Sequence, residues 1–556
     1  MKASDLFVKC LESEGVEYIF GIPGEENADM MMSLLKSEIQ FIITRHEQSA
    51  AFMADVYGRL TKKVGVCLAT LGPGATNLTT GIANANMDRS KVLAITGQTN
   101  VDSLHKESHQ NMDVITMFKP ITKWNWSIRN ADTIPEVIRH SFKISLEEKV
   151  GATHIELPQD IAKTTSNILP LVPTDTLRSP ANMFLIKKAV QLIMNAKKPL
   201  ILVGNGCIRE NATFYVRKLV ELTGICSMNT FMAKGVISDK SKHHLQTIGI
   251  KEADHALLAM KEADLVIAIG YDLVEYSPKF WNHTLDKKIL HIDFTPAETD
   301  TYYTPAVEIV ADIELTIDLI LSELEKEKEK DPSISCFPFH DIPELFKKIK
   351  SEVTHKISKY KDDTSYPIKP EKLITSVRKK LGPRDIVLSD VGVHKLWISK
   401  IYDTYFPNTC IIPNGFCSMG FALPASIAAD LLDTGNKIYA IAGDAGFLMN
   451  LQEMETAKRL ETNIVVIIWE DKSYGLIKWK QQIQFGENTD LDFTNPDWEL
   501  LAKSFGWNYI FEDESSQLIL TLKKIKKLKG PTLLIIPIDY SENLKLTQKL
   551  NDLEVE

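Results

Sequence analysis

Hydrophobic residues occur along this chain in short runs, separated by stretches in which apolar residues recur at helical spacing. The clearest runs cover residues 41–43, 66–69, 92–95, 200–203, 265–269, 386–388, 438–442 and 464–469. Short, almost wholly apolar runs are typical of strands buried on both faces, and parallel pairing of such strands needs crossovers like the helical stretches between them. The pattern therefore predicts an α/β protein built from open, mainly parallel sheets.

Three blocks of this kind are separated by less regular segments. We expect domains at residues 1–165, 183–325 and 366–556. A linker rich in Pro, Ser and Thr covers roughly residues 163–182. The charged run 323–330 is interpreted as the solvated end of a helix, and a looser connector follows it to about residue 366. The first and third blocks look like similar sheets with loops at their carboxyl edges.

In the third block, acidic residues follow two neighbouring strands. Asp444 comes after the run 438–442, and Asp471 comes shortly after the run 464–469. Ligands of open parallel sheets bind beyond the carboxyl ends of the strands, so both acids are expected at one edge. Two carboxylates beside glycines suit a magnesium ion that carries a diphosphate. On pattern alone, a purely structural role for acids that end buried strands is equally favoured.

The first block places Glu47 between the run 41–43 and a predicted helix over residues 49–60. A carboxylate there could serve only the helix dipole, or it could be a functional group at the edge of the sheet. A turn containing Gly74 follows the run 66–69, and Gly97 follows the run 92–95. Turn glycines are the simpler interpretation of each, but their tandem placement keeps a binding role open.

The order of these residues resembles that of thiamine-diphosphate enzymes of the acetolactate synthase group. The matching residues span nearly the whole chain: Glu47, Gly74, Gln110, His394, Met419, Asp444 and Asp471. The resemblance implies a thiamine-diphosphate-binding fold at each end and a Rossmann-like domain between them. It also implies that the catalytic Glu and the diphosphate domain come from different subunits. We therefore expect a homodimer or homotetramer with active sites at the subunit interface.

The resemblance implies a role for each matching residue. Glu47 would hydrogen-bond the aminopyrimidine of the cofactor and start its activation, and Gln110 would hold the oxygen of the bound substrate. Lys123 is a candidate for attracting the substrate carboxylate, with an ordinary surface lysine as the alternative. The expected cofactor contacts are Pro23, Gly24, Thr70, Gly74, Asn77, Gly392, Val393, His394, Cys417, Met419, Gly443, Asp444, Ala445, Gly446, Asp471, Ser473, Tyr474, Gly475, Leu476 and Ile477. Mg²⁺ would be bound by Asp444, Asp471 and Ser473.

Two of the expected cofactor contacts would hold the cofactor in its bent shape. Several other positions differ from the residues that the family usually has. Met419 would support the bent cofactor, and the main-chain carbonyl of Cys417 would hold its amino group. Ala445 stands where the family has Gly, and Glu470 precedes Asp471 where the family has Asn. The pair at residues 25–26 is Glu-Glu, where catabolic relatives commonly carry Ala-Lys. That exchange of charge leaves the second substrate open.

Several segments resemble the catabolic enzymes of the group, which do not use FAD. The segments 271–276 and 278–282 replace the Arg-rich segment of the FAD-binding relatives, so FAD is not expected. The expected reaction joins two pyruvate molecules into 2-acetolactate, with Ile477 and Lys480 shaping the acceptor side. Another thiamine-diphosphate-dependent carboligase or decarboxylase is the first alternative. A binding or regulatory protein on a degenerate scaffold is the second.

Composition narrows the cellular setting. The 556 residues are 44% hydrophobic and 25% charged with a net charge of −9, which argues against nucleic acid as a partner. The seven cysteines are scattered and lack metal-binding spacing, which favours reduced thiols. The chain shows no signal peptide and no apolar run of about 18 residues. We expect a soluble, cytoplasmic protein without membrane contact.

Overall fold

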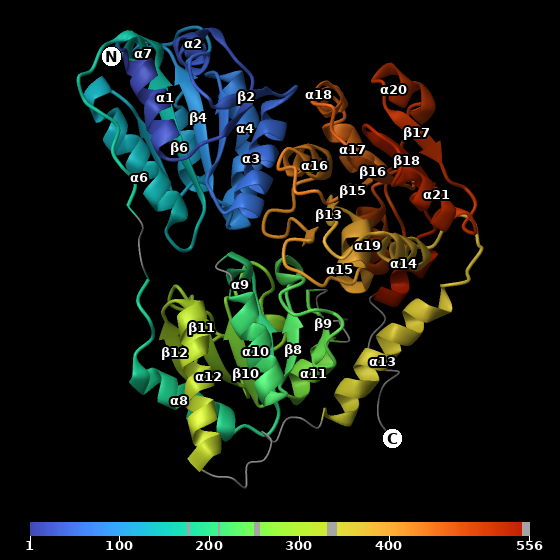
Figure 1. Ribbon diagram of the computed structural model, residues 1–556. Coiled ribbons are helices and arrows are strands. Elements are labelled where there is room, and N and C mark those ends of the chain that lie inside the picture. The colour runs from blue at the N-terminus through green and yellow to red at the C-terminus, as the bar shows by residue number, and fades with distance from the viewer. Residues whose placement is uncertain (175–177, 210–211, 250–255, 331–341, 547–556) are drawn as a thin grey trace.

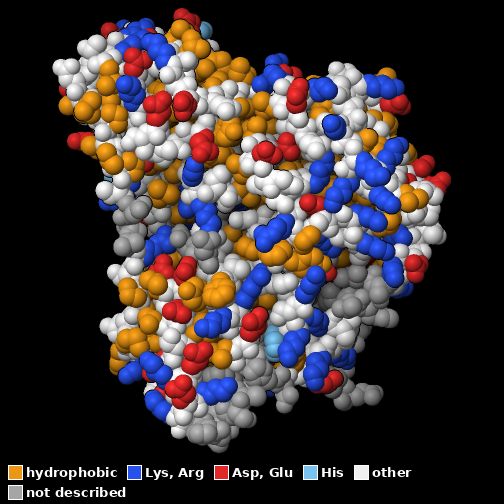
Figure 2. All heavy atoms as spheres, viewed as in Figure 1, with side chains coloured by type: hydrophobic (Ala, Val, Ile, Leu, Met, Phe, Trp, Pro, Cys, Tyr) orange, Lys and Arg blue, Asp and Glu red, His pale blue; other side chains and the backbone are white. Residues whose placement is uncertain are grey.

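A computed structural model describes residues 1–174, 178–209, 212–249, 256–330 and 342–546. It contains three six-stranded sheets, one from each predicted block, and every pairing between strands within them is parallel (Figure 1). This confirms the predicted α/β class. On the face shown in Figure 2, acidic and basic side chains are interspersed over the surface. Within the described ranges, no helix is long and apolar enough to cross a membrane.

The first domain is a sheet in the order β2-β1-β3-β4-β6-β5 with helices on both faces. Its strands are β1 (Tyr18–Gly21), β2 (Gln40–Ile43), β3 (Gly65–Ala69), β4 (Val92–Gln98), β5 (Trp124–Ser127) and β6 (Ala152–Pro158). Its helices are α1 (Ala3–Ser13), α2 (Ala28–Leu34), α3 (Glu47–Thr61), α4 (Pro73–Met87), α5 (Val114–Phe118), α6 (Ile134–Leu146) and α7 (Gln159–Lys163). Every residue of β3, β4 and β6 is buried, which the apolar runs 66–69 and 92–95 predicted for β3 and β4.

The third domain repeats this arrangement. Its order β14-β13-β15-β16-β18-β17 is the order of the first sheet, strand for strand. The strands are β13 (Ile386–Ser389), β14 (Cys410–Ile411), β15 (Ile438–Gly443), β16 (Val465–Glu470), β17 (Asn508–Phe511) and β18 (Thr532–Pro537). The helices are α14 (Pro370–Lys380), α15 (Val393–Ile401), α16 (Ala422–Asp430), α17 (Asp444–Met449), α18 (Glu453–Arg459), α19 (Gly475–Phe485), α20 (Trp498–Ser504) and α21 (Leu518–Ile525). The chain therefore carries the same fold twice, as expected.

The middle domain has the strand order β12-β11-β10-β7-β8-β9, which is the order of a Rossmann fold. Its strands are β7 (Pro199–Val203), β8 (Cys226–Asn229), β9 (His244–Thr247), β10 (Leu265–Ile269), β11 (Lys288–Asp293) and β12 (Val307–Val310). Its helices are α8 (Met183–Met194), α9 (Gly206–Arg209), α10 (Thr213–Thr223), α11 (Ala256–Glu262) and α12 (Ile313–Lys330). The charged run 323–330 forms the last turns of α12, as predicted.

The connector to the third domain is more ordered than expected. It contains helix α13 (Glu344–Lys359), which packs Phe346 and Ile349 against the core of the middle domain. Charged residues dominate this segment and leave it only a narrow apolar stripe, so no helix was predicted there.

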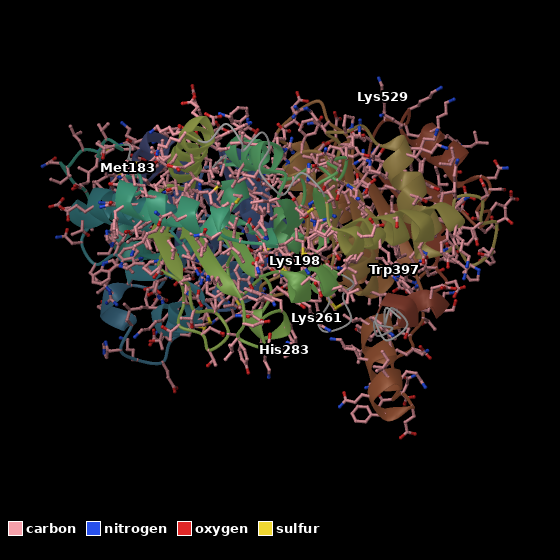
Figure 3. All side chains as sticks on the ribbon, turned by 90° about the horizontal axis from the view of Figure 1, so that it is seen from below. Met183, Lys198, Lys261, His283, Trp397 and Lys529 are labelled. Carbon is pink, nitrogen blue, oxygen red and sulfur yellow. The ribbon has the colours of Figure 1, made fainter. Side chains whose placement is uncertain are left out.

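The first and third domains share one continuous core. Helices α3 and α16 pack together, with the rings of Phe52 and Phe421 edge to face at 5.5 Å. Figure 1 shows α3 and α4 facing α16 across this contact, with the middle domain below. In the third domain, Trp397 of α15, labelled in Figure 3, donates from Nε1 to Asn543 Oδ1 at 2.8 Å and so connects α15 to the segment after β18.

Candidate active site

Glu47 is the first residue of α3 and lies at the carboxyl edge of the first sheet. Its side chain is only 8% exposed, and Oε2 accepts a hydrogen bond from Asn77 Nδ2 at 3.0 Å. A Cβ on Gly74 would lie 3.3 Å from Glu47 Oε1. Glycine at position 74 therefore leaves the second carboxylate oxygen open to a ligand.

The neighbouring loops bring further predicted residues to this edge. Gly24 lies so close to Thr70 that a Cβ would be 2.5 Å from the Cβ of Thr70. Thr70 Oγ1 donates to Glu26 Oε2 at 2.6 Å. Pro23 is exposed beside them. Glu26, one of the two acids at positions 25–26 that depart from the family, thus accepts a hydrogen bond from Thr70, a predicted cofactor contact.

Gln110 is also brought to this edge, on an exposed loop. Its φ is +57°, and a Cβ on Gly72 would lie 2.6 Å from its main-chain oxygen. The loop is anchored by Gln98, whose Nε2 donates to Met112 O at 3.2 Å and to buried Glu156 at 2.9 Å. Glu156 was missed in the sequence, where it is one polar residue in a buried strand.

Lys123 requires a correction. It precedes β5, so it lies at the amino edge of the sheet, opposite Glu47. Its ammonium group donates to Ile144 O at 2.5 Å and to Glu147 O, and burial lowers its pKa to about 8. The predicted contact with substrate is wrong for this geometry, because the lysine binds main-chain carbonyls within its own domain.

In the third domain, Asp444 and Asp471 lie together at the carboxyl edge of β15 and β16. Asp444 is 1% exposed, and its Oδ2 accepts from Lys472 N at 2.7 Å and from Asn495 Nδ2 at 2.9 Å. Burial and the negative charge of Asp444 raise the pKa of Asp471 to about 7. Two adjacent carboxylates that resist joint ionisation form a site that a cation would stabilise.

The chemistry of this pair fits Mg²⁺ held together with a phosphate ligand. Among the described residues, no group of three or more His, Cys, Asp or Glu side chains could hold a metal alone. Oxygen ligands from a diphosphate would complete the coordination shell that Mg²⁺ requires. Ser473 is buried next to the pair, and its main chain bridges to Asp492.

The departures from the family motif have structural explanations. Ala445 lies inside α17 and its φ is not positive, so glycine is not required there. Glu470 Oε1 accepts from Asn495 Nδ2 and from Trp498 Nε1, both at 2.9 Å. Glu470 thus anchors the loop whose Asn495 also contacts Asp444. The sequence offered no signal for Asn495, which lies in a loop beyond the motif.

Five other predicted residues lie on the segments next to the carboxylate pair. A Cβ on Gly475 would lie 2.3 Å from Asp471 Oδ2, so any larger residue would displace the carboxylate. In the same way, a Cβ on Gly446 would lie 2.9 Å from Asp390 Oδ1. Tyr474, Leu476 and Ile477 follow on α19 and its N-terminus, and Tyr474 and Ile477 are exposed.

His394 supplies a polar atom without a partner. It follows Gly392 and Val393 at the start of α15 and is 2% exposed. Burial lowers its pKa to about 3, so the imidazole is neutral near pH 7. Its Nε2 is buried without a hydrogen-bond partner, which normally costs about 1–3 kcal/mol. A Cβ on Gly443 would lie 3.5 Å from its Nδ1, so the ring lies beside the Asp444 motif. This nitrogen fits a diphosphate oxygen.

The loop that carries Cys417 and Met419 is held by both end domains. Asp390, a residue outside the predicted set, accepts from Gly420 N and Ala422 N at 3.0 Å each. Asp88 accepts from Gly415 N at 2.5 Å. Cys417 has φ +60°, and Met419 is half-buried. The loop is therefore fixed in shape before any ligand binds.

Comparison with known proteins agrees with this arrangement. Residues 1–117 match the "Thiamine pyrophosphate enzyme, N-terminal TPP binding domain", residues 186–320 its "central domain" and residues 390–536 its "C-terminal TPP binding domain". "Acetolactate synthase" of Bacillus subtilis (strain 168) is 34% identical over 98% of this chain and 94% of its own length. "Acetolactate synthase, catabolic" of Raoultella terrigena is 30% identical, covering 99% and 97%. "Probable acetolactate synthase large subunit" of Methanococcus aeolicus is 32% identical, covering 98% and 93%. The chain therefore belongs to the acetolactate synthase family of thiamine-diphosphate enzymes.

Proposed function

We propose that the protein is an acetolactate synthase, which joins two pyruvate molecules into 2-acetolactate with loss of carbon dioxide. The observation that carries this proposal is Glu47, a buried carboxylate with one oxygen fixed by Asn77 and the other facing Gly74. It lies in the domain that matches the N-terminal cofactor-binding domain of the family.

Each residue of the site has a separate task in this reaction. Bound thiamine diphosphate supplies the electron sink for decarboxylation. Glu47 holds a proton at the pyrimidine ring, and the Asn77 amide keeps its carboxylate in one orientation. Gln110 orients the carbonyl oxygen of the bound 2-oxo acid. His394 would donate to the diphosphate through its unpartnered Nε2, while Asp444 and Asp471 would hold Mg²⁺.

We further propose that each active site is formed by two copies of the chain. Within one chain, Ser418 N contacts Asn84 Oδ1 at 3.4 Å, near the end of α4. Glu47 contacts Asn77, roughly 10 Å nearer the start of that helix. Helix α19 buries none of its residues, and Ile483 and Phe485 are 53% and 65% exposed. A second copy would cover this helix and bring its own Glu47 to the cofactor.

The middle domain supports a reaction without FAD. Tyr271, Trp281 and Tyr303 are buried against one another, with ring centroids 5.7–6.2 Å apart. Tyr271 Oη donates to Tyr276 O within the same cluster. Tyr271 and Trp281 belong to the segments that stand where FAD-dependent relatives have their flavin-binding segment, and Tyr303 packs against both.

A product assay tests the proposal. The purified protein with pyruvate, thiamine diphosphate and Mg²⁺, and without FAD, is expected to form acetolactate and carbon dioxide. Acetaldehyde without acetolactate would instead favour a decarboxylase. Glu26 contacts Thr70, a predicted cofactor contact, and its negative charge bears on which acceptor substrate the site accepts. Other 2-oxo acids and aldehydes should therefore be tested as acceptors in the same assay.

A further inference from the structure

The turn that presents Glu47 leaves two main-chain N–H groups facing away from its own helix. Strand β2 ends at Ile43, and α3 begins at Glu47. His46 caps the helix, because its Nδ1 accepts from Gln48 N at 3.1 Å. The N–H groups of Arg45 and His46 stand outside that cap and need acceptors elsewhere.

Both groups donate to one carboxylate from the third domain. Glu453 Oε1 accepts from Arg45 N at 3.0 Å and from His46 N at 3.1 Å. Its Oε2 accepts from Thr456 Oγ1 at 2.6 Å. Glu453 is 0% exposed, although it lies 408 positions beyond Arg45 in the same chain.

A second contact joins the same two segments. Arg459, at the last turn of α18, donates from Nη2 to Ile43 O at 2.5 Å. Helix α18 therefore holds the turn at both ends, through Glu453 on its amides and Arg459 on the last carbonyl of β2. Burial raises the pKa of Glu453, while the hydrogen bonds from Thr456, Arg45 and His46 lower it.

We propose that Glu453 is a positioning residue for catalysis: it fixes the turn before Glu47 and so sets the direction of the catalytic carboxylate. A buried carboxylate is unfavourable unless its oxygens accept hydrogen bonds, and here three donors converge on it. Removing it leaves the partly buried N–H groups of Arg45 and His46 without this acceptor. The turn would then shift to satisfy them, and Glu47 would move with it.

This inference rests on the proposed function of Glu47, and its test separates the two. Turnover is measured for the full-length holoenzyme as wild type, Glu47→Gln, Glu453→Ala and the double variant. Glu453→Ala is expected to lower kcat by about 10- to 100-fold, because small misplacements of a catalytic group are that costly. On the Glu47→Gln background it should have almost no further effect. Near wild-type turnover of Glu47→Gln would overturn the role of Glu47 itself.

Conservative and control variants distinguish positioning from general damage. Glu453→Gln keeps an oxygen for both amides and should retain turnover within about threefold of wild type, since neutral acceptors still satisfy the turn. Thr456→Val removes only the hydroxyl that orients Glu453, and its smaller loss should also vanish on the Glu47→Gln background. Lys458→Ala, an exposed position on the same helix, should behave as wild type. Calorimetry is expected to give unchanged cofactor affinity for all of them.

The proposal fails if Glu453→Ala and Thr456→Val keep wild-type turnover. It also fails if they lower turnover by the same factor with and without Glu47. If Glu453→Ala does not fold, Thr456→Val and Glu453→Gln still decide the question.

Discussion

Asn77 donates from Nδ2 to Oε2 of Glu47 at 3.0 Å, so the N-terminal parts of two neighbouring helices meet at the Glu47 carboxylate. Helices α3 and α4 follow strands β2 and β3, whose carboxyl ends share one edge of the sheet. The fold thus places the Glu47 carboxylate, with one oxygen hydrogen-bonded by Asn77, at the edge of the sheet where a cofactor ring would bind. Its free oxygen faces Gly74, the one residue type that leaves it uncovered.

Replacing either residue of this pair should impair turnover without preventing cofactor binding. Glu47→Gln is expected to lower kcat at least about 100-fold, because general acid–base groups typically contribute that much. Asn77→Ala should lower it less, since it removes one hydrogen bond of about 1 kcal/mol and leaves the carboxylate in place. Steady-state kinetics and calorimetry with thiamine diphosphate and Mg²⁺ measure both effects. Unchanged kcat in Glu47→Gln would contradict the proton relay.

Gly475→Ala should abolish binding of Mg²⁺ and diphosphate while the apoprotein stays folded. The new methyl group would lie 2.3 Å from Asp471 Oδ2 and would force that carboxylate away from Asp444. Thermal unfolding checks this directly. Wild type should gain stability when both ligands are added, whereas the variant should not. An equal gain in both proteins would show that Asp471 is not needed.

Lys123→Met should change stability rather than catalysis. Burial lowers the pKa of Lys123 from its ordinary value of 10.5 to about 8, so folding disfavours the charged ammonium. The neutral form's contribution to stability is therefore present above the unfolded pKa and lost as pH falls through about 8. Relative to Lys123→Met, wild type should lose stability as pH falls from 10 to 8. Denaturant titrations at several pH values measure this difference, and kcat/KM should stay within about twofold, as for residues outside the site.

The strands and the placement of the acids that follow them could be predicted because each depends on local sequence. A wholly apolar run such as that of β4 predicts burial on both faces, and acids after β15 and β16 must share an edge once the sheet is parallel. Asn495 and Glu453 could not be predicted. They act on residues distant in sequence, and an Asn in a loop or a Glu on a helix carries no signal of its distant partner.

Lys123 failed for a related reason. The sequence predicted no strand over residues 124–127, so the place of Lys123 at the amino end of β5, opposite Glu47, was not foreseen. Helix α13 was missed because exposed charges outnumber the two apolar residues that anchor it. In both cases, contacts between segments distant in sequence determined the structure, and the local sequence pattern did not indicate them.

Mixing two inactive variants should restore activity if active sites are shared between copies. Glu47→Gln removes the proton relay, and Asp444→Ala removes the cation site. In a mixed dimer, one of the two sites would combine an intact Glu47 from one copy with an intact Asp444 from the other. Random pairing of equal amounts makes about half of the C2 dimers mixed, and each mixed dimer has one complete site out of two. About a quarter of wild-type activity is therefore expected.

The measurement requires subunit exchange, which low concentrations of denaturant followed by refolding would allow. Each variant refolded alone is the control and should stay inactive. Sizing of the wild type should show a dimer or tetramer, with α19 protected from hydrogen exchange despite its exposure in the single chain. Complete absence of activity in the mixture, with mixed dimers present by mass, would mean that Glu47 and Asp444 of one chain serve the same cofactor.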